Sequence, residues 1–125
     1  MTIDGRRDIV LLDGGIGQEI HRRSTRGDPH PLWSVMVMRE EPDVVIDVYQ
    51  DFLHAGAKVL ILNTYTATPT RLGKQGMESE LHHIHQEASA LVDNAIQQSG
   101  IARARISKMG CLPPLVASYV AEAAP

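Results

Sequence analysis

Short apolar runs alternate with longer amphipathic stretches along the chain, which predicts strands and helices in turn. Three runs, at residues 9–12, 58–62 and 103–108, have the apolar and β-branched character of buried strands, the last of them more weakly. Each run is followed by polar or flexible residues that stop a strand. We therefore expect three strands at these places.

Apolar residues at helical spacing fill the intervals between these runs. Pro42 suits the first turn of a helix, and Gly56 and Gly100 suit the positions that follow a last turn. Residues 69–76 predict a loop or a short turn. The predicted helices cover residues 18–23, 32–39, 42–55 and 78–99.

The order strand, helix, strand, helix, strand predicts a parallel sheet with right-handed connections. The chain stops at Pro125, shortly after the third predicted strand, and nothing in the sequence closes such a sheet. A three-stranded parallel sheet leaves an apolar face and two open edges. We therefore interpret the chain as a fragment of a larger α/β structure that self-associates through its open face.

The ends of the three predicted strands carry the candidate chemistry. Asp13-Gly14-Gly15 follows the first strand, Asn63 and Tyr65 follow the second, and Cys111 follows the third. In parallel α/β folds, substrates bind at the carboxyl ends of the strands. These groups are thus expected on one rim of the sheet.

Composition narrows the function classes. The chain has 125 residues and a net charge of −3, which gives no reason to expect nucleic acid or a membrane surface as a partner. It has one cysteine, so no internal disulfide can form, and its N-terminus lacks a secretory signal core. We expect a cytoplasmic protein with a mostly aliphatic core.

Several sequence blocks occur together in an order and spacing that resemble the homocysteine S-methyltransferase family. They span nearly the whole chain, and the set is more specific than any single block. The blocks lie at residues 12–20, 31–34, 42–49, 51–57, 62–68 and 110–114.

The resemblance implies a fold and a reaction. The family fold is a (β/α)8 TIM barrel, of which residues 1–125 would be the incomplete N-terminal portion, with the first three strands and their helices. The family is zinc-dependent and transfers a methyl group from a sulfonium donor to homocysteine, giving methionine. The branch that uses S-methylmethionine or S-adenosylmethionine is the most similar. The alternative is a non-catalytic truncated barrel that acts through association with another chain.

The resemblance also implies substrate-binding residues in this segment but no catalytic or metal-binding ones. The family binds zinc through three cysteines that lie beyond this chain, and Cys111 matches none of them. We therefore expect no zinc on this segment and no methyl transfer by the segment alone.

Asp13 resembles the acid that holds the substrate amino group, although an Asp here can equally cap a turn. Gly14 and Gly15 would bring the backbone to the substrate or merely form a turn. Asn63 and Tyr65 would line the pocket, or belong to a capped loop with a packed ring.

Trp33, the only tryptophan, would face the cationic methyl donor, or pack its loop onto the barrel. His82, His83 and His85 look like a metal cluster but lie on a helix expected outside the barrel, which favours solvated side chains. Lys108 replaces the small apolar residues of the family, and burial of a lysine is unfavourable, so the third strand is expected to be irregular.

Overall fold

The computed structural model describes residues 2–3, 6–7, 9–27 and 30–113. The helices in this part of the chain are α1 (Ile16–Arg23), α2 (Trp33–Glu40), α3 (Pro42–His54), α4 (Pro69–Gly73) and α5 (Leu81–Ser99), with 3-10 turns η1 (Glu78–Glu80) and η2 (Arg103–Arg105). The strands are β1 (Thr2–Ile3), β2 (Arg6–Arg7), β3 (Val59–Ile61) and β4 (Ser107–Met109).

The predicted parallel sheet is present but small. β3 and β4 pair in parallel, with Val59 opposite Ser107 and Ile61 opposite Met109. A parallel bridge joins Leu12 to Val59 on the other side of β3. Parts of the three predicted strands therefore lie side by side in parallel, with the segment at Leu12 and β4 flanking β3. β1 and β2 form a separate antiparallel pair at the N-terminus.

The first predicted strand, at residues 9–12, is wrong as an extended strand. Two hydrogen bonds flank its single bridge, from Lys58 N to Leu11 O at 2.7 Å and from Asp13 N to Val59 O at 3.0 Å. The segment stays exposed, with Ile9 94% and Leu12 48% accessible. Its apolar character signals a need for burial, but among the described residues only β3 pairs with it.

Two other expectations need correction. Residues 103–105 form the turn η2 rather than a strand, and Arg103 Nη1 donates to Ile106 O at 2.7 Å across that turn. Residues 69–73 form a helix, α4, instead of a loop. Thr68 caps α4 by accepting a hydrogen bond from the Arg71 amide, and Pro69 occupies its first turn.

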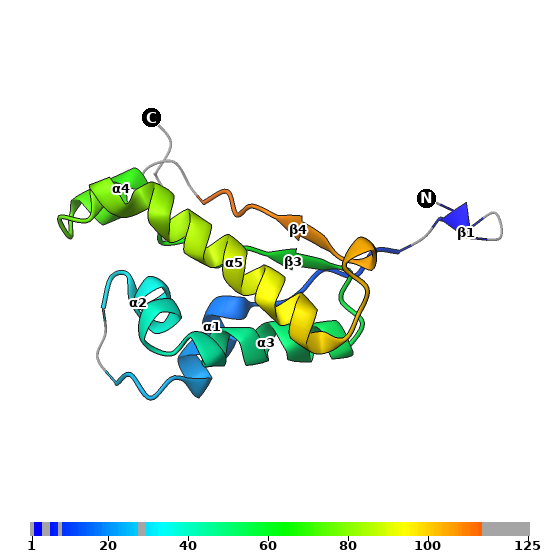
Figure 1. Ribbon diagram of the computed structural model, residues 1–125. Helices are drawn as coiled ribbons and strands as arrows, with labels where there is room; N and C mark the ends of the chain where they lie inside the picture. The colour runs from blue at the N-terminus through cyan, green and yellow to red at the C-terminus, as the bar shows by residue number, and fades with distance from the viewer. Residues whose placement is uncertain (1, 4–5, 8, 28–29, 114–125) are drawn as a thin grey trace.

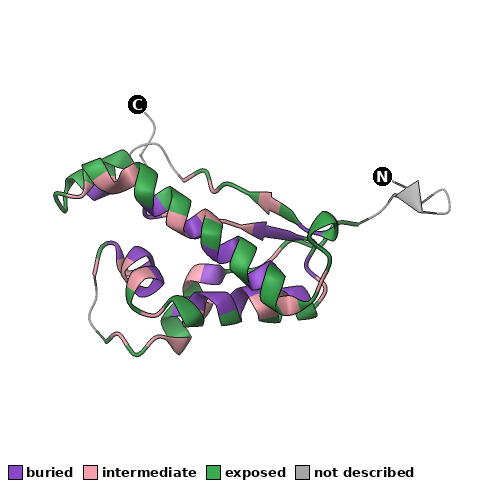
Figure 2. Ribbon diagram, in the orientation of Figure 1, coloured by how far each residue is buried: buried purple, intermediate pink, exposed green. Residues whose placement is uncertain are grey.

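The core lies between the helices and one face of the sheet. α3 packs along α5, and both lie on the same side of β3 and β4 (Figure 1). Leu60 and Ile106 enter this core, together with Tyr49 from α3 and Val92 from α5. Figure 2 shows the buried residues on the sides of α3 and α5 that face each other and the sheet.

The opposite face of the sheet carries exposed apolar side chains. Leu12 and Met109 are 48% and 51% accessible, and Ile61 is half-buried. Paired residues of a parallel sheet share a face, so Ile61 and Met109 lie together on this side, away from Leu60. We call Leu12, Ile61 and Met109 the open sheet face.

Lys108 lies within β4, although the third predicted strand is shortened at residues 103–105. It is the partner of Leu60 in the register, so it lies on the helix side of the sheet. Its ammonium group bonds Asp93 at 2.9 Å and Ser89 at 2.7 Å, both on α5. The charge is thereby paired near the surface instead of being buried. In the described part of the chain, no helix is long and apolar enough to cross a membrane.

Candidate functional site

A pocket of about 460 Å³ lies beyond the carboxyl ends of the parallel strands. Its walls come from the loop that leads into α1, the start of α2, the segment that follows β3, the first turn of α4, and Cys111 after β4. The volume falls in the range of small-molecule sites. The lining residues are Gly14, Gly15, Ile16, Gly17, Gln18, Pro31, Trp33, Ser34, Ile61, Leu62, Asn63, Tyr65, Thr66, Arg71 and Cys111.

The structure brings together five of the six residues that the sequence suggests for substrate binding. Gly14, Gly15, Trp33, Asn63 and Tyr65 all line the pocket. The ends of the three parallel segments therefore meet at one rim, as their order predicts. The sixth residue, Asp13, is not part of the lining but directly precedes it.

Asp13 ties the first parallel segment to β3. Its Oδ2 accepts a hydrogen bond from the Ile61 amide at 2.9 Å. Its Oδ1 is buried and has no hydrogen-bond partner among the described residues. Burial raises the pKa of this carboxyl, and the Ile61 hydrogen bond opposes the rise. An unsatisfied buried acceptor is unfavourable, so Oδ1 is a place where a bound cationic donor would be stabilised.

Gly14 and Gly15 have different roles. A Cβ atom on Gly14 would lie 2.8 Å from Cε1 of Phe52, so the Phe52 ring requires a glycine there. A Cβ on Gly15 would meet no described atom within 4 Å. Gly14 is therefore explained by packing against α3, whereas Gly15 leaves open space beside the pocket.

Asn63 is buried and holds α2 against the sheet. Its Nδ2 donates to the Ser34 carbonyl at 3.1 Å. The Ser34 and Thr66 hydroxyls lie 2.9 Å apart in a second buried hydrogen bond. This geometry matches the interpretation of Asn63 as part of a capped loop, although the residue also lines the pocket.

Tyr65 is half-buried and stacks with a residue that the sequence analysis missed. The guanidinium carbon of Arg71 lies 5.5 Å from the centre of the Tyr65 ring, a cation–π contact. Arg71 belongs to the first turn of α4, and it also lines the pocket. The Thr68-Pro69 helix start is the sequence signal that could have placed it there.

Trp33 is half-buried at the first position of α2. Its ring meets His21 of α1 edge-on, with ring centres 5.2 Å apart. The same indole lines the pocket, so it both packs α2 against α1 and faces a ligand-sized space.

Two further groups lie near the strand ends. The Tyr49 hydroxyl donates to the Ile61 carbonyl at 2.6 Å, and burial raises the pKa of Tyr49. Burial also raises the pKa of the Cys111 thiol. The thiol is therefore neutral near pH 7 and is no activated nucleophile.

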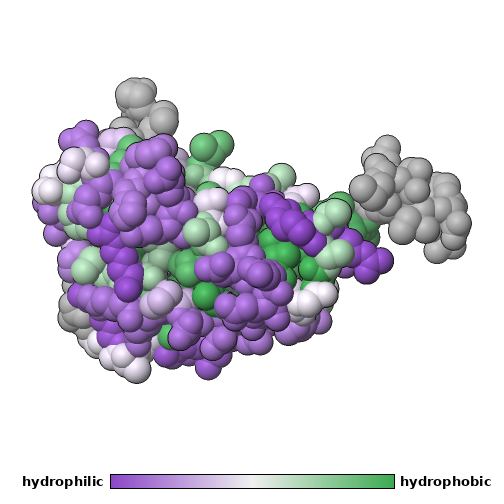
Figure 3. All heavy atoms as spheres, in the orientation of Figure 1, coloured by the Kyte–Doolittle hydropathy of each residue, from purple (hydrophilic) through white to green (hydrophobic). Residues whose placement is uncertain are grey.

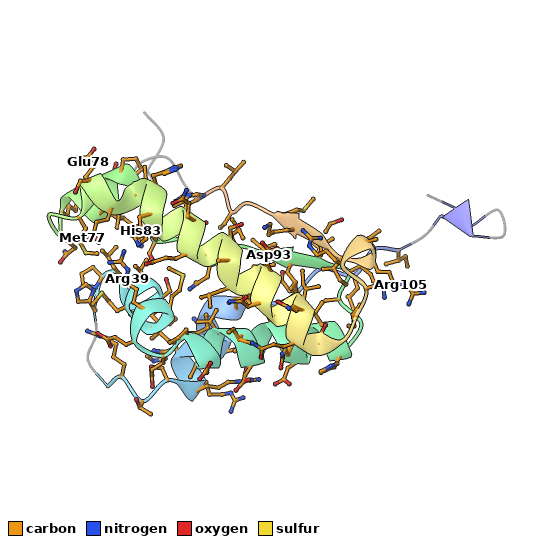
Figure 4. The ribbon with its side chains drawn as sticks, viewed as in Figure 1. Arg39, Met77, Glu78, His83, Asp93 and Arg105 are labelled. Carbon is orange, nitrogen blue, oxygen red and sulfur yellow. The ribbon has the colours of Figure 1, made fainter. Side chains whose placement is uncertain are left out.

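The three clustered histidines lie on the surface of α5, and all are exposed. His83 pairs with Glu87 at 2.9 Å, and His85 Nε2 lies 2.9 Å from the Ala67 carbonyl. Glu87 also binds Arg39 of α2 at 3.0 Å, and Figure 4 shows Arg39 and His83 on these neighbouring helices. Across residues 9–27 and 30–113, no three His, Cys, Asp or Glu side chains are arranged to hold a metal ion.

A second cavity, of about 530 Å³, lies between the end of α5 and the start of β4. Its ionic lining residues already pair with one another, because Asp93 binds Lys108 at 2.9 Å and lies 3.7 Å from Arg103. The face that carries α5 is mostly hydrophilic (Figure 3). This groove therefore offers a solvated ion cluster and lies away from the strand ends that form the pocket.

Comparison with known sequences gives one family. The profile described as homocysteine S-methyltransferase matches residues 10–123. The homocysteine S-methyltransferase of Escherichia coli K12 is 30% identical over 98 residues, which are 78% of this chain and 29% of that protein. Homocysteine S-methyltransferase 4 of Zea mays is 30% identical over 113 residues, 89% of this chain and 32% of that protein.

Comparison with solved structures agrees. The metallated form of the homocysteine methyltransferase MmuM from Escherichia coli superposes with a TM-score of 0.72 at 27% identity. The match covers 86% of this chain and 38% of that chain. The chain thus spans about a third of the length of the relatives that it matches.

Proposed function

Because the chain belongs to the homocysteine S-methyltransferase family, we propose that it forms part of the substrate site of a methyltransferase that acts on homocysteine. In that reaction a carbon–sulfur bond of a sulfonium donor breaks and the methyl carbon bonds to the thiolate of homocysteine. The donor leaves as a neutral thioether, and methionine forms. Residues 1–125 would supply the first three strands of a (β/α)8 barrel.

The pocket at the strand ends is the observation that carries this proposal. It gathers Gly15, Trp33 and Tyr65 from three separate segments of the chain. These segments meet at the carboxyl ends of the parallel strands, and barrel enzymes bind their substrates at those ends. The residues that the structure describes are proposed to bind and orient the substrates, and none is proposed to be catalytic.

Asp13 is proposed to hold the amino group of the substrate. Its buried Oδ1 lacks a partner among the described residues, and an ammonium group would satisfy it. A charge-assisted hydrogen bond of this kind contributes about 1.5–3 kcal/mol. The Ile61 amide fixes the other carboxylate oxygen and so orients the group.

Trp33 is proposed to face the sulfonium of the donor. An aromatic face attracts a cation by about 0.5–2 kcal/mol. The Trp33 ring already contacts His21 of α1. It therefore loses little further side-chain freedom when a ligand binds. Gly15, Asn63 and Tyr65 complete the walls around the substrate.

Zinc is implied for the complete family enzyme, but the described residues do not fit it. A zinc–thiolate site needs a converging set of ligands, and no three suitable side chains converge between residues 9 and 113, leaving aside 28–29. Cys111 is a single thiol whose pKa is raised. We therefore propose no metal ligand in this part of the chain.

The test is a methyl-transfer assay of the protein encoded by the whole reading frame that includes residues 1–125. Methionine would be measured with L-homocysteine and, in separate arms, with S-methylmethionine or S-adenosylmethionine. Asp13→Asn should raise KM for homocysteine about tenfold or more. Asp47→Asn, an exposed change on α3, is the control and should change nothing. If no methionine forms with either donor, the proposal is refuted.

A non-catalytic role is the second candidate, and the open sheet face supports it. Leu12 and Met109 are about half exposed there, as expected of a surface that another chain covers. A reading frame that ends at residue 125, together with a stable hetero-complex, would favour this role. A reading frame that continues into three further cysteines would favour the methyltransferase.

A further inference from the structure

Two buried hydroxyl groups line the pocket from different segments of the chain. Ser34 lies in the first turn of α2, and Thr66 lies in the segment that follows β3. These residues are 4% and 7% accessible, and their hydroxyl oxygens lie 2.9 Å apart in one hydrogen bond. Both belong to the pocket lining. The pair therefore joins two walls of the pocket and forms part of the surface that a ligand would meet.

The pair has one hydrogen-bond donor left over. Each hydroxyl carries one hydrogen, and the bond between Ser34 and Thr66 uses only one of the two, whichever oxygen donates. Among the described residues, neither hydroxyl makes a second hydrogen bond. A buried donor without an acceptor is unfavourable. The pair therefore favours a ligand that brings an acceptor to this wall of the pocket.

The backbone on both sides holds the pair in place. The buried Asn63 amide donates to the Ser34 carbonyl at 3.1 Å. The Thr66 carbonyl accepts a hydrogen bond from the Thr68 amide at 3.0 Å. A donor that is already oriented costs little further freedom when a ligand binds to it.

We propose that the Ser34–Thr66 pair donates a hydrogen bond to the α-carboxylate of the amino acid that occupies this pocket, an inference that rests on the function proposed above. An ammonium group has no lone pair to accept a hydrogen bond, and the sulfur of a sulfonium carries a positive charge. The carboxylate is the strong acceptor that homocysteine and an amino-acid sulfonium donor share. With Asp13 at the ammonium group, the two charged groups of the amino acid would meet separate partners.

Two other roles for the pair predict different behaviour. If the hydroxyls only tie α2 to the segment that follows β3, their loss should weaken every ligand of the pocket to the same extent. If they face the sulfur of homocysteine, their loss should weaken only ligands that carry a thiol. A contact with the carboxylate should weaken every ligand that has a carboxylate, with or without a thiol.

The experiment is isothermal titration calorimetry of the protein encoded by the whole reading frame that includes residues 1–125. The probes are L-homocysteine, L-methionine, which has the carboxylate but no thiol, and 3-aminopropane-1-thiol, which has the thiol but no carboxylate. The aminothiol is titrated in competition with homocysteine if its own heat is small. The main variant is Ser34→Ala with Thr66→Val, because either hydroxyl alone can still donate. Ser79→Ala with Ser107→Ala removes two exposed hydroxyls outside the pocket lining and is the control.

We expect the main variant to weaken binding of homocysteine and methionine about tenfold or more, and to change binding of the aminothiol by less than about twofold. Of the two single variants, the one that removes the hydroxyl facing the ligand should show most of this loss. Thr66→Ser keeps a hydroxyl and should retain most of the affinity. The control should bind like the unaltered protein.

Equal weakening of all three probes would overturn the inference and assign the pair a structural role. Weakening of homocysteine and the aminothiol without methionine would overturn it in favour of the sulfur. Unchanged affinity for both amino acids would also overturn it, while leaving the proposed function intact. If the unaltered protein binds neither amino acid, the proposed function and this inference fail together. Circular dichroism checks the fold of each variant, and the two single variants carry the same comparison if the double variant misfolds.

Discussion

Replacing Gly14 by alanine should destabilise the chain, whereas the same change at Gly15 should not. The new Cβ at position 14 would lie 2.8 and 2.9 Å from two ring carbons of Phe52. Carbon atoms pack best at about 3.5–4.0 Å, so the ring must move by several tenths of an ångström. At Gly15 the added carbon meets no described atom within 4 Å.

The magnitude follows from overpacking. Forcing an extra carbon into a packed region costs about 1–3 kcal/mol. Phe52 is only half-buried on α3, so its ring can shift and the cost should be about 1–2 kcal/mol. Neither glycine has a positive φ, and the unfolded chain loses the same freedom in both variants. The pair is therefore matched, and the difference between them isolates the contact with Phe52.

Urea unfolding and thermal unfolding, each followed by circular dichroism, measure the stability of both variants. A loss of 1 kcal/mol in the free energy of unfolding lowers Tm by about 3–6 °C for a chain of this size. The double variant Gly14→Ala/Phe52→Leu should recover most of the loss, because the two changes are coupled through one contact. Equal stability of the Gly14 and Gly15 variants, or no coupling with Phe52, would refute the packing explanation.

Three further predictions concern the sheet. Burial raises the pKa of the Asp13 carboxyl above its ordinary value of 3.8. Its contribution to the free energy of unfolding is therefore greatest below pH 3.8 and is lost as the pH rises through the pKa of the folded state. Asp13→Asn should remove this part of the pH dependence in urea titrations and leave the stability at pH 7 equal or higher. Tyr49→Phe removes a buried hydrogen bond to the Ile61 carbonyl and should lower the free energy of unfolding by about 1–2 kcal/mol; an unchanged midpoint would contradict this. Leu12→Gln with Met109→Gln on the open sheet face should reduce concentration-dependent association in sedimentation velocity, and equal association of both proteins would show that another surface is used.

The helices were the most predictable part of the fold. Local signals determine them: Pro42 lies at the start of α3, and Gly100 follows α5 with a φ of 76°. Gly56 likewise has a φ of 109° just after α3. α4 was missed although Thr68 and Pro69 form a helix start, because five residues are too few for a periodic apolar pattern.

The sheet was predictable in order and direction but not in extent. A strand forms only where neighbours supply hydrogen-bond partners, and the composition of residues 9–12 says nothing about how many neighbours they have. The rim site was predictable because parallel strands end together. Arg71 was not predictable, because its position depends on how α4 turns toward Tyr65.

An amide chemical-shift map of the 15N-labelled chain during titration with L-homocysteine would show, residue by residue, whether the pocket at the strand ends binds this amino acid. We expect the largest shifts at Gly15, Trp33, Tyr65 and Arg71, which line this pocket. Shifts that instead centre on the groove around Asp93, or a spectrum that does not change at all, would contradict this expectation.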